Sequence, residues 1–66
     1  MTIPTGKEFC KQLEQRGWSL RRIEGSHHIY GQSGSIVRIS VPVHANKQLK
    51  LGLYKHLRKL AEMENE

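Results

Sequence analysis

The sequence contains no long hydrophobic run, and only one of its 66 residues is a cysteine. A helix that crosses a membrane needs about 18 or more consecutive apolar residues, so none is expected here. Residues 1–11 lack the apolar segment of a secretory signal. The single thiol, Cys10, cannot form an internal disulfide, which fits a reducing compartment. We therefore expect a cytoplasmic protein in which Cys10 is a small packed residue and not a nucleophile.

Acidic residues are also scarce, since six of them stand against eleven lysines and arginines, which gives a formal net charge of +5. Three of these acids lie in the last five residues, so the middle of the chain is more basic than the average. A compact basic surface favours a polyanionic partner, above all nucleic acid. The alternative is a merely soluble surface that carries a few extra lysines.

The length of 66 residues allows one domain, spanning residues 1–66, with one small core. A chain of this size buries only roughly 60% of the surface that its unfolded form exposes. We therefore expect marginal stability, or stabilisation by a partner.

Helical periodicity occurs near both ends of the chain. Thr5 and Glu8 have the spacing of a capping box, and Gly17 provides a stop signal, which predicts a first helix over residues 6–16. A continuous apolar face predicts the last helix over residues 51–63. That face consists of Leu53, Tyr54, Leu57, Leu60 and Ala61.

Between these helices apolar and polar residues alternate, as they do in strands. Strands are predicted over residues 18–23, 27–30 and 37–43, and the broken alternation at Arg22 predicts a bulge. The third strand has the clearest apolar stripe, made of Val37, Ile39, Val41 and Val43. The order helix, three antiparallel strands, helix predicts a two-layer α+β domain. Both helices should cover one face of the sheet and leave the other face open.

Two adjacent histidines begin the second predicted strand, directly after a turn signal at Gly25-Ser26. An imidazole exchanges protons near neutral pH, and a turn followed by a strand holds such a ring at a fixed, accessible place. Alternation puts His27 on the face of Ile29, which is expected to point at the core, unless His27 precedes the regular strand. His28 and Tyr30 are then expected to share the open face.

Several segments resemble the HicA family of bacterial toxins, and together they cover nearly the whole chain. They are Gly17-Trp18, Gly25-Ser26-His27-His28-Ile29-Tyr30, Val41-Pro42-Val43-His44, Leu49-Lys50-Leu51-Gly52 and the closing helix. The family usually has proline where this chain has Leu51. The resemblance implies a fold like the double-stranded RNA-binding domain and an mRNA interferase activity. It also implies neutralisation by a HicB antitoxin, and His27 as the catalytic residue.

The chemistry can also be argued without the family, because RNA carries its own nucleophile, the 2′-OH beside each phosphate. A side chain that deprotonates this group, or protonates the leaving 5′-oxygen, cleaves the strand without a metal. Such help is worth roughly 10²- to 10⁴-fold in rate. We expect His27 to transfer the proton and nearby cations to stabilise the charge on the phosphate. The candidate RNA-binding residues are Arg22, His28, Arg38, Lys47 and Lys50. For each, an ordinary surface or packing role is the alternative.

The remaining histidines offer no metal site by their spacing. His44 follows the third strand and is a further candidate for the site, with an ordinary loop residue as the alternative. His56 is expected to be exposed on the last helix. Zinc binding by the histidines and Cys10 is disfavoured, because adjacent strand residues point apart and no Cys-x-x-Cys or His-x-x-x-His spacing occurs. We expect neither a metal nor a cofactor.

Three functions stay open at this stage. The first, favoured by the Gly-Ser-His segment, is a metal-independent endoribonuclease toxin; the second is a non-catalytic RNA-binding module. The third is a protein-interaction domain that uses the open sheet face, and the fold alone does not decide between them. Only four residues are aromatic, and we expect them to be largely buried. Sequence-specific reading of RNA usually needs exposed aromatic rings, so little sequence preference is expected.

Overall fold

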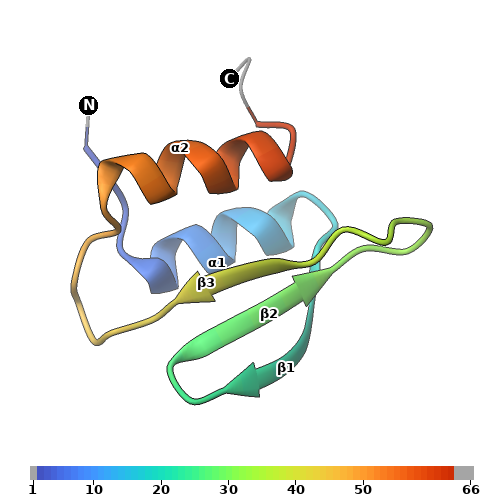
Figure 1. Ribbon diagram of the computed structural model, residues 1–66, viewed down its shortest axis with the longest axis horizontal. Helices are drawn as coiled ribbons and strands as arrows, with labels where there is room; N and C mark the ends of the chain where they lie inside the picture. The colour runs from blue at the N-terminus through green and yellow to red at the C-terminus, as the bar shows by residue number, and fades with distance from the viewer. Residues whose placement is uncertain (1, 64–66) are drawn as a thin grey trace.

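The structure, a computed structural model, describes residues 2–63. The elements in chain order are α1 (Gly6–Gln15), β1 (Ser19–Glu24), β2 (His27–Gly31), β3 (Ile39–Pro42) and α2 (Leu51–Leu60) (Figure 1). The strands form one antiparallel sheet in the order β1-β2-β3. The predicted α+β class and the α-β-β-β-α order are therefore confirmed. Within residues 2–63, neither helix is long and apolar enough to cross a membrane.

The capping box predicted for the first helix is present. The Thr5 hydroxyl accepts a hydrogen bond from the Glu8 amide at 3.1 Å, and the Glu8 carboxylate accepts one from the Thr5 amide at 2.9 Å. These two bonds satisfy amides of the first turn that have no partner within the helix. They explain why α1 begins at Gly6, as predicted, and α1 ends one residue before the predicted boundary.

The last helix begins at Leu51, as predicted, although the residue is not proline, but it ends at Leu60 and not near residue 63. Glu62 adopts a left-handed φ of 57°. The amides of Glu62 and Met63 then donate back to the carbonyls of Lys59 and Arg58, at 3.1 and 2.8 Å. This pattern is a Schellman motif, usually formed with glycine, and it stops the helix while returning Met63 to the core.

One core fills the space between the helices and the sheet. Phe9 of α1 meets Tyr54 of α2 edge to face, with ring centroids 5.9 Å apart and an interplanar angle of 86°. The largest fully buried side chains are Tyr30, Phe9, Leu13, Ile39 and Val41. All four aromatic residues of the chain, including Trp18, are buried.

The strand register decides which side chains face this core. His28 lies opposite Val41, and Tyr30 lies opposite Ile39, so all four point to the helix side of the sheet. His27 and Ile29 therefore point to the open side. The expectation that Ile29 faces the core while His28 and Tyr30 face outwards is wrong. Tyr30 can occupy the core position because its hydroxyl still has a partner there: it donates to the Glu14 carboxylate at 2.7 Å while the ring is buried.

The start of α1 touches the end of β3 with no room for a side chain. A Cβ placed on Gly6 would lie 2.0 Å from the carbonyl oxygen of Pro42. Beside this contact, the Leu49 amide donates to the Pro4 carbonyl at 2.9 Å, and Thr5 forms an isolated antiparallel β-bridge with Gln48. The starts of both helices and the end of β3 are thus held together at one corner of the molecule.

We expect Gly6→Ala to lower the free energy of unfolding by about 1–3 kcal/mol, because the added methyl group forces backbone apart in a packed region. Gly52→Ala is the matched control, since it lies in α2 with no other atom within 4 Å of the added carbon. That change should stabilise by up to about 1 kcal/mol through helix propensity. Urea unfolding followed by circular dichroism measures both. Equal effects at the two positions would contradict the close packing at Gly6.

Candidate functional site

His27 is held firmly by its backbone while its side chain is exposed. It is the first residue of β2 and pairs with Glu24 on one side and Pro42 on the other. The hydrogen bond from the Val43 amide to the Ser26 carbonyl, at 2.7 Å, continues the pairing one step beyond it. The imidazole therefore stands at a fixed place on the open side of the sheet, where a ligand can reach it.

A bulge in β1 brings an unexpected arginine to this open side. Leu20 pairs with Tyr30 and Arg22 pairs with Ile29, so Arg21 is an extra residue in β1. An extra residue of this kind puts two consecutive side chains on the same face of a strand. Arg21 and Arg22 both lie on the open side as a result. The sequence predicted a bulge near Arg22, but Arg21 was not recognised as a candidate.

Gly31 allows two guanidinium groups to lie close against the open side of the sheet. A Cβ on Gly31 would lie 2.8 Å from Nε of Arg21 and 3.0 Å from Nη1 of Arg38. Nη1 of Arg38 also donates to the carbonyls of Ser35 and Val37, at 3.3 and 3.1 Å, which fixes its position. Arg21, in β1, and Arg38, the residue before β3, therefore both lie over Gly31 of β2.

We use the term open face for the surface formed by His27, Ile29, Gly31, Arg21, Arg22, Glu24, Arg38 and Ser40. One of its arginines, Arg22, forms an ion pair with Glu24. Among residues 2–63, neither Arg21 nor Arg38 forms an ion pair with a carboxylate. Guanidinium groups bind phosphate through paired hydrogen bonds, so Arg21 and Arg38 can hold an anionic phosphate at the Gly31 end of this face. His27 lies at the other end of β2, about 13 Å away along the strand.

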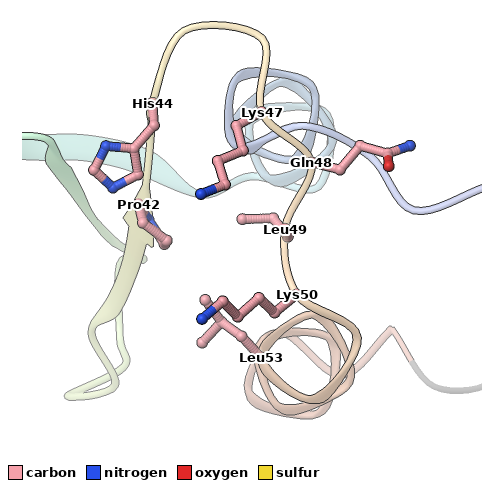
Figure 2. Close-up of a pocket in the computed structure, with 7 residues that line it drawn as sticks. All are labelled: Pro42, His44, Lys47, Gln48, Leu49, Lys50 and Leu53. Carbon is pink, nitrogen blue, oxygen red and sulfur yellow. The ribbon is translucent and has the colours of Figure 1, made fainter.

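The two predicted lysines lie elsewhere, in a groove between the end of β3 and the start of α2 (Figure 2). Lys47 and Lys50 line it together with His44, which the sequence marked as a further candidate. Pro42 also lines the groove, and Pro42 is the residue opposite His27. The groove and the open face are therefore neighbours on either side of one strand.

His28 lies apart from both regions, on the helix side of the sheet. It is half-buried in a hollow that is also lined by Cys10, Leu20 and Tyr30. Burial raises the pKa of the Cys10 thiol, which keeps it protonated, as expected of a packed residue. Burial, and then the hydrogen bond to Glu14, raise the pKa of Tyr30 as well. His28 therefore lies on the opposite side of the sheet from His27.

The geometry also bears on metal binding. His27 and His28 point to opposite sides of the sheet, so the adjacent pair cannot grip one ion. Across residues 2–63, no three His, Cys, Asp or Glu side chains are grouped so as to hold a metal.

A family model described as the HicA toxin of bacterial toxin-antitoxin matches residues 6–63. The chain belongs to the HicA toxin family. No individual curated protein matches it. The match runs from the first residue of α1 to the end of the described chain, so it confirms the resemblance drawn from the sequence motifs. A HicA toxin is one member of a toxin-antitoxin pair, which implies an antitoxin as partner.

We expect Arg21→Ala to weaken binding of a single-stranded oligonucleotide, and Gly31→Ala to do so by displacing the Arg21 and Arg38 side chains. Each loss should be several-fold, with a smaller salt dependence because a phosphate contact is removed. Arg22→Ala is the matched control and should act less, since Glu24 already neutralises that side chain. Fluorescence anisotropy at several salt concentrations measures all three. A larger effect of Arg22→Ala would contradict the role assigned to the bulge.

Proposed function

We propose that this HicA-family chain is an endoribonuclease that cleaves mRNA, with His27 as the group that transfers the proton. The observation that supports this most is the position of His27. Its exposed imidazole shares the open face with three arginines, at a place fixed by backbone pairing on both sides. Since mRNA is the substrate, the cytoplasm is where we expect the activity.

The proposed reaction uses the nucleophile that RNA supplies. The 2′-oxygen attacks the adjacent phosphorus, the bond from phosphorus to the 5′-oxygen breaks, and the products are a 2′,3′-cyclic phosphate and a 5′-hydroxyl. His27 either accepts the proton of the 2′-hydroxyl or donates a proton to the leaving 5′-oxygen. Imidazole suits both roles near neutral pH, and such proton transfer contributes roughly 10²- to 10⁴-fold. This chemistry does not require a metal ion.

The arginines of the open face supply positive charge for the phosphates of the bound strand. Negative charge accumulates on the non-bridging oxygens as the 2′-oxygen attacks, and preorganised donors aimed at those oxygens lower the barrier. Arg22 pairs with Ile29, two residues from His27, and its charge is shared with Glu24. Arg21 and Arg38 lie beside Gly31, about 13 Å along β2 from His27, so they bind a phosphate further along the strand. Because these contacts are made to the backbone of RNA, they favour no particular base.

Little sequence preference accompanies this arrangement. Proteins that read single-stranded RNA by sequence stack its bases on exposed aromatic or arginine side chains. Here all four aromatic rings lie in the core, and the arginines of the open face are assigned to phosphates. We therefore propose that cleavage depends on access to a flexible strand more than on a base motif.

A HicB-like antitoxin is the proposed partner. An acidic or groove-filling segment that covers the open face would neutralise its arginines and exclude RNA from His27. A partner that binds only the folded chain also stabilises it by mass action, which matters for a domain of 66 residues.

We expect His27→Ala to reduce RNA cleavage by at least about 100-fold, since the proton-transfer group is lost. Oligonucleotide affinity and the free energy of unfolding should change little, because the side chain is exposed and the arginines are untouched. His56→Ala on α2 is the matched control, and it should cleave as the parent chain does. Cleavage of a labelled RNA in EDTA measures the rate.

Two outcomes would contradict this proposal. If the parent chain binds RNA but leaves it intact for hours in EDTA, it is a non-catalytic RNA-binding module or needs a metal. If His27→Ala cleaves at the parent rate, another residue carries the reaction.

We expect the charge reversals Arg21→Glu and Arg38→Glu, combined in one chain, to weaken the complex with the antitoxin more than tenfold. The reason is that an acidic segment loses two attractive contacts and meets two repulsive ones. The matched control is the double change Lys55→Glu and Lys59→Glu, which alters the net charge equally on the exposed side of α2. Co-purification with the product of the neighbouring gene, followed by calorimetry, measures both. A complex unaffected by the arginine changes would place the antitoxin elsewhere.

A further inference from the structure

The groove beside β3 is a basic hollow whose walls come from two directions. In Figure 2, Pro42 and His44 lie along the strand side, while Lys47 and Lys50 extend from the segment that leads into α2. The amino groups of both lysines point toward the strand. The apolar side chains of Leu49 and Leu53 lie between and below them, and the hollow has a volume of about 330 Å³. That size is at the lower end of the range for ligand sites, about 300–1,000 Å³.

The charges in this groove call for an anion. Among the described residues that line it, three can carry positive charge and none is acidic. Two ammonium groups that point into one hollow repel each other unless an anion lies between them. A phosphate is the simplest such anion, because each lysine has three donors to offer and a phosphate oxygen accepts several.

The backbone that carries these lysines is built to hold this shape. The Lys47 amide donates to the His44 carbonyl at 2.9 Å, closing a turn in which Ala45 has a left-handed φ of 50°. Such a conformation is costly for a residue with a Cβ, and it recurs at ligand sites. Beyond the turn, Leu49 is buried and its amide is bonded to the Pro4 carbonyl. The backbone between Lys47 and Lys50 is therefore held in place by hydrogen bonds at Lys47 and Leu49.

We propose that this groove binds a phosphate of the RNA strand next to the phosphate cleaved at His27. The inference rests on the proposed function, and it extends the substrate site across β3. Pro42 is the link, since it pairs with His27 and also lines the groove. An RNA strand that crosses β3 at Pro42 presents one phosphate to the open face and a neighbouring one to Lys47, Lys50 and His44. Recognition in the groove is of the backbone phosphate, so it is independent of the base.

This arrangement makes binding depend on the number of phosphates in the ligand. A dinucleotide has one internal phosphate and cannot occupy both places, whereas a longer strand can. The groove should therefore lower KM for long RNA and leave the rate on a dinucleotide unchanged, because it binds a part of the substrate remote from the reacting bond.

The test uses single-stranded DNA of ten nucleotides, which lacks the 2′-hydroxyl and cannot be cleaved by the proposed route. We expect the double change Lys47→Ala and Lys50→Ala to reduce its affinity about tenfold or more. The slope of log affinity against log salt should fall in magnitude by about 0.7, the value for one phosphate contact on a single strand. The matched control is the double change Lys55→Ala and Lys59→Ala on the exposed side of α2, which removes the same charge. Unfolding curves of both variants verify that the fold is intact.

Three results would overturn the proposal. Equal losses in the two double variants would mean that only the overall charge matters. An unchanged salt slope in the groove variant would mean that no phosphate contact was lost. A slower reaction on a dinucleotide RNA would place the groove at the cleaved phosphate itself.

The outcome is separable from that of the proposed function. DNA affinity reports on the groove whether or not the chain cleaves RNA, and His27→Ala reports on cleavage whether or not the groove binds phosphate. A groove variant with weaker DNA binding in a chain that never cleaves would uphold the groove and reject the nuclease.

Discussion

The contact of Gly6 with the carbonyl of Pro42 is the constraint on which the arrangement of this molecule depends. At 2.0 Å from a would-be Cβ, the contact admits only glycine, and it ties the start of α1 to the end of β3. Pro42 in turn lies opposite His27 and lines the basic groove. A shift of α1 away from β3 would therefore move the pairing of His27 and the groove wall together. Stability and the proposed site meet at this one backbone contact.

The sheet separates the core from the candidate site. Its helix side carries Tyr30, Ile39 and Val41, which are fully buried, and its open face carries His27 and the arginines. Gathering like charges on one surface costs free energy through repulsion, and it is tolerated where a polyanion or an acidic partner binds. The bulge at Arg21 and the missing side chain of Gly31 increase this concentration of charge. Neither feature adds to the core, so both are better explained by binding than by folding.

Much of the fold could be predicted from the sequence, because capping and periodicity act locally. Thr5, Glu8 and the valine stripe near the third strand are read from neighbours a few residues away. Which side chains of β2 point to the core could not be predicted in that way, because Ile29 and Tyr30 are adjacent and either could be buried. Tyr30 is the buried residue, and its hydroxyl donates a hydrogen bond to Glu14, sixteen residues away. The early end of α2 was missed because Glu62 adopts a conformation that usually signals glycine.

The candidate site was predictable as a histidine after a turn, but its surroundings were not. Arg21 and Arg38 come together only once β1 gains its extra residue, and Lys47 and Lys50 face His44 only once the turn at Ala45 closes. The first is a contact between segments distant in sequence and the second depends on one unusual φ. Neither can be predicted from the pattern of neighbouring residues. The groove and the open face are adjacent because Pro42, the last residue of β3, pairs with His27 and also lines the groove. An extended polyanion lying across that boundary contacts cations on both sides, whereas a single small anion contacts one side. The geometry of the sheet edge is therefore one more argument for the proposal that the ligand is a strand of nucleic acid.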